Sequence, residues 1–260
     1  MPSISSTENL LAGLSDRQRE AVTHTDGPLL IVAGPGSGKT RVMAHRVAYL
    51  VGEKGIPPWK ILAVTFTNKA ARELRERCER LVGVGSNELQ VRTFHGFCSR
   101  VLRTDGEKVG LKPEFTIYDT DDQARVARKI LDDLDVDPKQ FPPRSLLSVI
   151  SDAKNSMRSP AQLSRRTETY RDEIAARVYE SYEGALQRAN AVDFDDLLLK
   201  TFQLLEGHPE MLTKYQKRFE HLLVDEFQDT NELQFQVARL LAMKSQNICV
   251  VGDPDQSIYS

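Results

Sequence analysis

Residues 33–40 read Ala-Gly-Pro-Gly-Ser-Gly-Lys-Thr and directly follow the apolar run Leu-Leu-Ile-Val at residues 29–32. A glycine-rich turn between a buried strand and a helix can aim backbone N–H groups at phosphate oxygens. Lys39 can reach the β- and γ-phosphates of a nucleotide, and the Thr40 hydroxyl can ligate Mg²⁺. The helix that follows, over residues 38–51, points its partially positive end at the same anion. This stretch therefore predicts a strand–loop–helix unit that binds ATP or GTP with Mg²⁺.

One residue of the loop departs from the usual pattern. Position 33 holds alanine where G-x-x-x-x-G-K-[ST] has glycine, and Gly34 supplies flexibility one residue later. The alternative is a glycine-rich turn that binds nothing. The predicted nucleotide-binding residues of the loop are Ala33, Gly34, Pro35, Gly36, Ser37, Gly38, Lys39 and Thr40.

Composition narrows the class of protein. The 260 residues are 40 % apolar and 28 % charged, which is typical of a soluble globular protein with an ample core. The formal net charge of −2 neither indicates nor excludes a nucleic-acid partner. The apolar runs are too short to cross a membrane, and residues 1–10 lack the pattern of a secretory signal. Cys78, Cys98 and Cys249 have no metal-ligand spacing, so we expect reduced thiols with packing roles in a cytoplasmic protein.

Strand-like and helical patterns alternate in the first part of the chain. Runs rich in β-branched residues predict strands at residues 61–66 and 90–93. Residues 68–81 and 94–109 carry helical patterns. A strand–helix alternation implies an α/β fold with a parallel sheet, whose ligands bind at the carboxyl ends of the strands.

The alternation stops after residue 109. Residues 110–191 carry mainly helical patterns, in which Thr120 and Gln123 fit a capping box that opens a helix. Strands return at residues 221–225 and 247–251, with a helix between them. We therefore expect an α/β nucleotide-binding domain made of residues 1–109 and 192–260, with a mostly helical subdomain inserted at residues 110–191.

The second half of the predicted site lies near the end of the chain. Residues 222–229 read Leu-Leu-Val-Asp-Glu-Phe-Gln-Asp, an apolar strand that ends in carboxylates. Asp225 is placed to hold Mg²⁺, and Glu226 to position and polarise the water that attacks the γ-phosphate. Gln228 follows in the loop, where a glutamine is often simply solvated. After the next strand, the amide of Gln256 can sense whether a γ-phosphate is present.

These motifs, taken in order, resemble the superfamily 1 DNA helicases, and within them the UvrD/PcrA/Rep group. The resemblance runs from Leu14 to Ser260 and implies a RecA-like domain that uses ATP and Mg²⁺ in a motor moving 3′ to 5′ on single-stranded DNA. It also implies that Gln18 hydrogen-bonds adenine and that Arg41 packs against the base. Ser15 and Gln18 also fit a capping box, so Gln18 has two candidate roles.

The resemblance implies a set of DNA-contacting residues as well. Aromatic side chains such as Phe66 would stack on bases, a contact worth roughly 1–3 kcal/mol. The alternatives are aromatic residues that pack in the core and a capping role for His95. The implied contacts to single-stranded DNA are Thr65, Phe66, Asn68, Thr93, His95, Phe194 and Tyr259.

A basic excess in the inserted region fits two interpretations. The resemblance suggests contact with duplex DNA at a junction between single and double strands, whereas a solvated helix face explains the same charges. The basic residues are Lys154, Arg158, Arg165, Arg166, Arg171 and Arg177.

The chain stops at Ser260, inside a motif that continues in the resembled group. We therefore expect a portion that lacks the second RecA-like domain, binds Mg-ATP and single-stranded DNA weakly, and does not unwind DNA alone. Two alternatives stay open: a nucleotide-dependent module that docks a repair or transcription protein, and the motor part of a helicase–nuclease complex. A GTPase is disfavoured, because Asn68-Lys69 is not continued into the guanine-reading motif.

Overall fold

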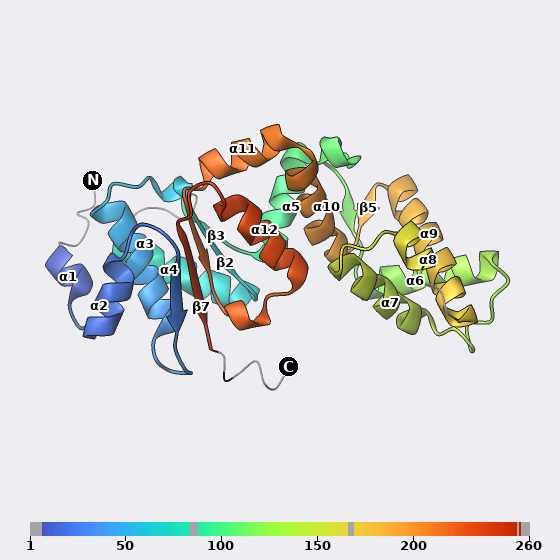
Figure 1. The fold of residues 1–260 in the computed structure, drawn as a ribbon, viewed down its shortest axis with the longest axis horizontal. Coiled ribbons are helices and arrows are strands. Elements are labelled where there is room, and N and C mark those ends of the chain that lie inside the picture. Colours follow the sequence, from blue (N-terminus) through green and yellow to red (C-terminus); the bar gives the residue numbers. More distant parts are fainter. Residues whose placement is uncertain (1–6, 84–87, 166–168, 254, 256–260) are drawn as a thin grey trace. The chain divides into compact units, whose positions relative to one another are not determined.

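The computed structural model describes residues 7–83, 88–165, 169–253 and 255 (Figure 1). The chain divides into two compact units. Unit 1 consists of Met1–Phe97, Pro209–Thr230 and Ala238–Ser260, and unit 2 consists of Cys98–His208 and Asn231–Val237. The predicted domain bounds, at residues 109–110 and 191–192, lie elsewhere and stay a prediction about where a subdomain is inserted.

Unit 1 is built on a parallel sheet, as the alternation of strands and helices predicts. The strand order is β1-β7-β6-β2-β3, and every neighbouring pair is parallel. β1, with β7 as its neighbour, forms one edge of this sheet. The strands are β1 Leu29–Val32, β2 Ile61–Thr65, β3 Gln90–Thr93, β6 His221–Val224 and β7 Ile248–Gly252.

Two amphipathic helices cover one face of the sheet. Apolar residues of α3 and α4, among them Met43 and Leu74, form a buried core with Ala63, Leu223 and Val251 of the strands. This burial of apolar surface is the main force that holds the layers together. The helices and short 3₁₀ turns of unit 1 are α1 Thr7–Leu11, α2 Asp16–Thr23, α3 Lys39–Gly52, η1 Pro58–Lys60, α4 Asn68–Val82, α11 Pro209–Arg218 and η3 Phe227–Asp229.

The opposite face of the sheet is covered unevenly. Val64 of β2 and Val224 of β6 are paired in register and fully buried. On β1, however, Leu30 is 65 % exposed and Val32 is 61 % exposed. Since strands of a parallel sheet are normally buried on both faces, this apolar patch of β1 is unusual.

Unit 2 is mostly helical, as predicted, with its own apolar core. The core joins α6, α7 and α9 through residues such as Ile130, Leu146, Ile150 and Tyr182. α5 begins in unit 1 and ends in unit 2, and α12 begins in unit 2 and ends in unit 1. The elements are α5 Phe94–Asp105, η2 Gly106–Val109, β4 Thr116–Ile117, α6 Thr120–Asp133, α7 Pro143–Asn155, α8 Pro160–Ser164, α9 Tyr170–Ala189, β5 Ala191–Val192, α10 Phe194–Gly207 and α12 Glu232–Ala242.

Two local features of unit 2 differ from the sequence prediction. The capping box that opens α6 consists of Asp119 and Asp122, so the predicted pair of Thr120 and Gln123 is wrong by one position. Asp119 Oδ1 accepts hydrogen bonds from the N–H groups of Asp121 and Asp122, both at 2.9 Å. A carboxylate caps a helix better than a threonine here because it also complements the positive helix end. The short strand β5, which pairs in parallel with β4, was not predicted.

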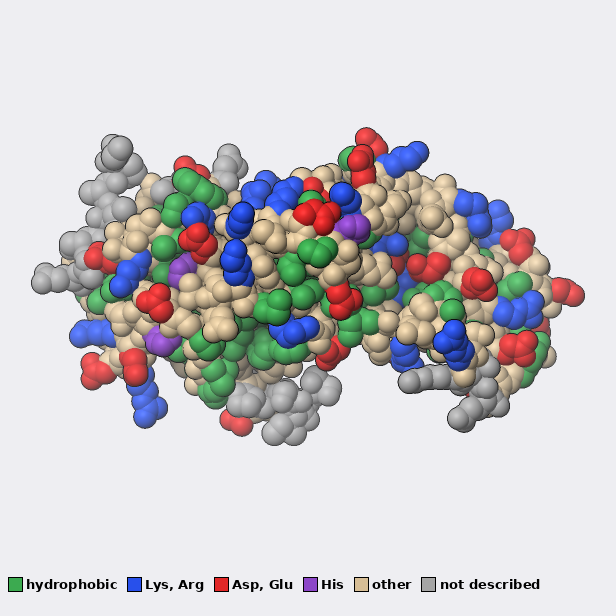
Figure 2. Space-filling view, turned by 45° about the horizontal axis from the view of Figure 1, so that its top comes forward, with side chains coloured by type: hydrophobic (Ala, Val, Ile, Leu, Met, Phe, Trp, Pro, Cys, Tyr) green, Lys and Arg blue, Asp and Glu red, His purple; other side chains and the backbone are tan. Residues whose placement is uncertain are grey.

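The charge pattern of the surface is mixed. Basic and acidic side chains are interspersed over the face seen in the space-filling view rather than separated by sign (Figure 2). Cys78, Cys98 and Cys249 are free and buried, as expected for thiols with packing roles. Over the described ranges, no helix combines the length and the apolar character needed to cross a bilayer.

Candidate nucleotide-binding site

The predicted phosphate loop connects β1 to α3. Gly36 and Gly38 have φ angles of 73° and 87°, in the left-handed region that glycine adopts without strain. Gly38 is the N-cap of α3 and no side chain caps the first turn of that helix. The first N–H groups of α3 therefore remain available to an anion, and the helix dipole favours negative charge at this end.

Lys39 begins α3 and faces carboxylates from two other loops. Its side chain is only 9 % exposed. Its ammonium lies 3.5 Å from Glu226 Oε2 and 3.8 Å from Asp253 Oδ2. Both separations are longer than the distance of about 2.7–2.9 Å that is typical of a strong charge-assisted hydrogen bond. The lysine is therefore attracted to these carboxylates but not tightly bound by them.

Asp225 and Glu226 follow β6, at the carboxyl end of the sheet. Asp225 is 4 % exposed, and its Oδ1 accepts a hydrogen bond of 3.1 Å from the N–H of Glu226. Burial, and next the charge of Glu226, raises the pKa of Asp225 to about 6. Glu226 has a φ of 47°, a left-handed conformation that is costly for a residue with a side chain. Such strain persists only where the neighbouring contacts fix it.

Gln228 supplies one of those contacts. Its Nε2 donates a hydrogen bond of 2.8 Å to Glu226 Oε2, and its Oε1 accepts one of 3.0 Å from the N–H of Asp253. Gln228 thus joins the loop after β6 to the loop after β7. The alternative of a simply solvated loop glutamine is therefore wrong, and in the sequence only its place beside two carboxylates pointed to a role. We call the four residues Lys39, Glu226, Gln228 and Asp253 the Lys39 ring.

The residues predicted to hold Mg²⁺ have suitable chemistry. Thr40 offers a hydroxyl oxygen at the start of α3, and Asp225 offers a buried carboxylate. Mg²⁺ prefers such hard oxygen ligands and is usually held by one or two carboxylates together with substrate phosphates. The raised pKa of Asp225 is the mark of a buried carboxylate whose negative charge a cation would stabilise.

The segment predicted to contact adenine lies against the phosphate loop. Ser15 and Gln18 form the expected capping box of α2. The Nε2 of Gln18 also donates a hydrogen bond of 3.0 Å to the carbonyl of Ser37. The exposed Arg41 extends its guanidinium toward Gly13, where an added Cβ would lie 3.3 Å from Nη2. Contact of Gln18 or Arg41 with a base stays a prediction.

Arg46 explains why α2 stays beside the loop. Its side chain is almost fully buried, and it donates hydrogen bonds to the carbonyls of Ala21, at 2.9 Å, and His24. These bonds satisfy carbonyls at the end of α2 and attach that helix to α3.

The predicted DNA contacts of unit 1 cluster after β2 and β3. Thr65 and Thr93 are register partners at the ends of these strands. The Thr93 hydroxyl accepts a hydrogen bond from the N–H of Gly96, and the Thr65 hydroxyl donates one to the carbonyl of Thr67, so both threonines also stabilise local turns. Phe66 is half-buried and packs edge-on against Phe94, with ring centroids 5.9 Å apart.

The remaining predicted contacts are placed individually. Asn68 is exposed at the start of α4, and His95 is half-buried in the first turn of α5. Phe194 belongs to unit 2, where it is 49 % exposed at the start of α10. Gln256 and Tyr259 lie outside the described residues.

A second group of ionisable residues, in unit 2, was not foreseen. Lys154 has no exposed surface, and its ammonium lies 2.8 Å from carboxylate oxygens of Glu183, Asp193 and Asp196. The Tyr182 hydroxyl donates a hydrogen bond of 3.1 Å to Asp193. We call these five residues the Lys154 cluster. The expectation that Lys154 belongs to a basic surface is therefore wrong, because neighbouring carboxylates compensate its charge inside the unit.

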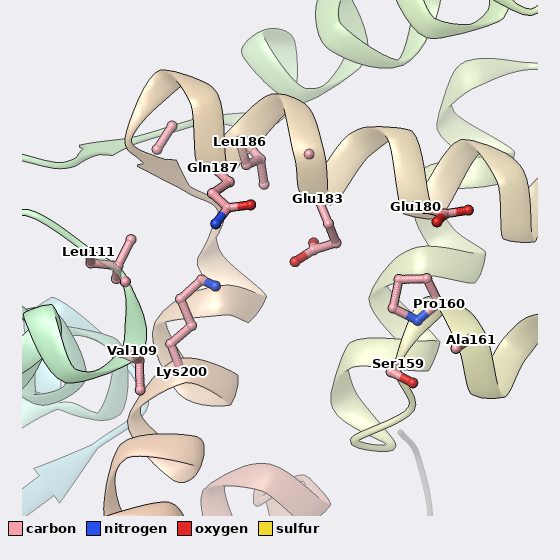
Figure 3. Close-up of a pocket in the computed structure, with 13 residues that line it drawn as sticks. Val109, Leu111, Ser159, Pro160, Ala161, Glu180, Glu183, Leu186, Gln187 and Lys200 are labelled. Atoms are coloured by element: carbon pink, nitrogen blue, oxygen red, sulfur yellow. The ribbon is translucent and has the colours of Figure 1, made fainter.

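The Lys154 cluster adjoins a cavity of about 510 Å³ in unit 2. Glu183 from α9 and Lys200 from α10 both point into this cavity, and Glu180 lies further along α9 (Figure 3). Glu183 therefore connects the buried lysine to a space that solvent can enter.

A phosphate loop after β1, a following helix, and acidic residues at the end of β6, a parallel strand separated from β1 by β7, define a RecA-like P-loop NTPase domain. The chain belongs to the UvrD/REP helicase family, whose N-terminal domain matches residues 14–260.

Curated relatives agree with this assignment. The chain is 49 % identical over 253 residues to the ATP-dependent DNA helicase PcrA of Bacillus subtilis (strain 168) and 48 % identical over 255 residues to that of Leuconostoc citreum. It is 47 % identical over 250 residues to that of Staphylococcus aureus (strain Mu50 / ATCC 700699). These matches cover 97 %, 98 % and 96 % of this chain but only 34 % of each relative. The chain thus spans about a third of the length of these proteins.

Proposed function

We propose that this chain is the nucleotide-binding portion of an ATP-dependent DNA helicase that moves 3′ to 5′ and acts in DNA repair. The observation that carries the proposal is the position of Lys39, at the start of α3 and opposite the carboxylates that follow β6 and β7. The ammonium can leave these long contacts for the β- and γ-phosphates of ATP. The names of the relatives, which are ATP-dependent DNA helicases, support the same function.

The proposed hydrolytic residues divide the chemistry among them. Bound Mg²⁺ would neutralise phosphate charge, and Thr40 and Asp225 would hold it. Glu226 would orient the attacking water, and Gln256 would sense the γ-phosphate. Gln18 and Arg41 would bind the adenine.

Single-stranded DNA would cross the carboxyl ends of β2 and β3. Thr65, Asn68, Thr93 and His95 would contact its backbone or base edges, and Phe66 would stack on a base. The support is that Thr65 and Thr93 end neighbouring strands, while Phe66, Asn68 and His95 follow within three residues of those ends. Phe194 and Tyr259 are proposed as further stacking residues.

By itself, the chain is proposed to bind Mg-ATP and DNA weakly and to hydrolyse ATP slowly, without unwinding. It spans 34 % of its relatives, and translocation requires domains that close on ATP and reopen after hydrolysis. Arginine fingers supplied from elsewhere typically contribute a factor of about 10³–10⁵ in kcat.

The nucleotide-binding proposal is tested by titrating the chain with Mg²⁺ and a fluorescent ATP analogue. Lys39→Ala is expected to raise Kd at least about tenfold, the loss of roughly one strong charge contact. The matched control is Lys54→Ala, an exposed lysine just beyond the other end of α3. Steady-state hydrolysis with and without single-stranded DNA extends the test. Equal affinity of Lys39→Ala and the unmodified chain would overturn the proposal.

DNA binding is tested by fluorescence anisotropy with labelled oligothymidine. Phe66→Ala should weaken binding by about 1–3 kcal/mol, the range for one stacked base. The matched control is Trp59→Ala, a half-exposed aromatic residue just before the other end of β2. If the two variants lose affinity equally, the proposed path across the ends of β2 and β3 is wrong.

A further inference from the structure

The four residues of the Lys39 ring form a closed set of contacts. Lys39 attracts the carboxylates of Glu226 and Asp253, and Gln228 links Glu226 to the backbone of Asp253. Each member therefore contacts the next, and the three loops that carry the site are joined through four side chains.

The contacts of Gln228 require a side chain that can both donate and accept a hydrogen bond. One amide donates to a carboxylate and accepts from a backbone N–H, whereas a glutamate at position 228 would offer two acceptors and repel Glu226. The loop after β7 is shaped to match. A Cβ built at Gly252 would lie 3.0 Å from Gln228 Oε1 and 3.6 Å from its backbone nitrogen.

Asp253, a second residue of the Lys39 ring, is held in position by burial and by its contacts. It is 1 % exposed, its Oδ1 accepts a hydrogen bond of 3.2 Å from the N–H of Asp255, and its Oδ2 faces Lys39. A buried carboxylate beside a lysine stabilises the ammonium where it stands. The phosphates of a nucleotide must therefore compete with Asp253 for the same ammonium.

We propose that Asp253 and Glu226 restrain Lys39 until nucleotide binds, and that Gln228 is the positioning residue that holds both carboxylates in reach of it. This inference rests on the proposed function, since it concerns how Lys39 becomes available to ATP. After Lys39 turns to the phosphates, Gln228 would still hold the Glu226 carboxylate, so Gln228 has a second task in orienting that carboxylate toward water.

Restraining Lys39 and orienting Glu226 predict opposite effects of substitution: tighter nucleotide binding but slower hydrolysis. Damage to the fold would weaken both. Asp253→Asn keeps the shape and the Oδ1 acceptor but removes the charge that competes for Lys39. Its Kd for Mg-ATPγS is expected to fall about three- to tenfold, the effect of one moderate ion pair. Gln228→Ala loosens the same restraint and should lower Kd in the same direction, whereas single-turnover ATP hydrolysis should slow at least about tenfold because Glu226 loses its orientation.

The experiment measures Mg-ATPγS affinity by calorimetry and single-turnover hydrolysis of radiolabelled ATP on the same chain. The control is Asp255→Asn, which changes net charge equally at an exposed position. Tighter binding by Asp253→Asn than by the control supports the inference, and equal or weaker binding overturns it. Weaker binding together with slower hydrolysis in Gln228→Ala would identify a merely structural role and also overturn it. If the unmodified chain binds and Lys39→Ala does not, the proposed function stands whatever these variants do, whereas no binding by any variant would overturn both.

Discussion

Lys39 in unit 1 and Lys154 in unit 2 both face carboxylates, yet the distances to those carboxylates differ. Lys154 has three carboxylate oxygens at 2.8 Å and no exposed surface. Lys39 has two, at 3.5 Å and 3.8 Å, and retains some exposure. Three short ion pairs hold the Lys154 ammonium in place, whereas the long contacts of Lys39 would let it exchange partners. The contact distances therefore distinguish the structural Lys154 from Lys39, for which we propose nucleotide binding.

The ionisation of Lys154 agrees with a structural role. Burial alone would lower its pKa, but the carboxylates of Asp196, Asp193 and Glu183 raise it well above the usual value. The three carboxylates therefore favour the charged form of Lys154.

The largest effect should come from removing the charge of Lys154. Lys154→Met leaves the carboxylates buried without their cation, which typically costs about 3–5 kcal/mol. Hydrogen exchange of the amides of α7 and α9, measured in increasing urea, should show that unit 2 is less stable in this variant. Trp59 fluorescence reports unit 1, since it is the one tryptophan of the chain. Lys139→Met, at an exposed position, is the control. If Lys154→Met lost no more stability than Lys139→Met, the structural role of Lys154 would be contradicted.

The next largest effect is the pH dependence of the stability of unit 2. Burial raises the pKa of Asp196 to about 7, against the opposing charge of Lys154, and Asp193 and Glu183 raise it further. The folded unit then holds a proton that the unfolded chain releases above its usual pKa of 3.8. The free energy of unfolding should therefore fall as pH rises from about 4 to about 7 and level off above. Asp196→Asn, which mimics the protonated form, should flatten this slope in hydrogen exchange of α9. An unchanged slope would mean that Asp196 is ionised throughout.

A smaller effect is expected from the hydroxyl that supports Asp193. Tyr182→Phe removes the hydrogen bond of 3.1 Å to that carboxylate, and bonds to charged groups contribute about 1.5–3 kcal/mol. Urea unfolding with the same unit 2 readout measures the loss. Tyr170→Phe is the control, because Tyr170 is 65 % exposed. If both variants lose equal stability, the hydroxyl contributes nothing to the Lys154 cluster.

The smallest change in stability should follow from Lys39→Met. The contacts of Lys39 are long and Glu226 is partly exposed, so even with Asp253 left buried the free energy of unfolding of unit 1 should fall by only about 1 kcal/mol. Nucleotide affinity, in contrast, should be lost in the same sample. Trp59 fluorescence in urea measures the first quantity and calorimetry with Mg-ATPγS the second. A loss of several kcal/mol would show that Lys39 is as structural as Lys154.

The same pair of lysines shows what sequence can and cannot predict. The phosphate loop is contiguous, so residues 33–40 are enough to predict the strand, the turn and the helix. The partners of Lys154 lie 29, 39 and 42 positions away in the chain, and no local pattern pairs them. The sequence nonetheless held a sign that Lys154 is buried. Lys154 follows Leu146 by two helical turns and Ile150 by one, so it lies on the same buried stripe of α7.

Gln228 illustrates a different limit. Its role depends on two loops meeting at the end of neighbouring strands, and strand order β6–β7 is a tertiary property. The predicted cap of α6 was wrong for a simpler reason. Several polar residues follow one another there, and each could start a helix. The residue that completes the most hydrogen bonds, Asp119, is the N-cap.

The exposed apolar side chains of Leu30 and Val32 have a practical consequence for work with this chain. They lie on β1, an edge strand of the sheet formed by the described residues, where exposed apolar side chains can recruit another molecule. Concentrated samples are therefore expected to self-associate through β1, in a manner that weakens with dilution. Because β1 leads directly into the phosphate loop, nucleotide titrations need to be run at more than one protein concentration, or aggregation will be mistaken for a change in affinity.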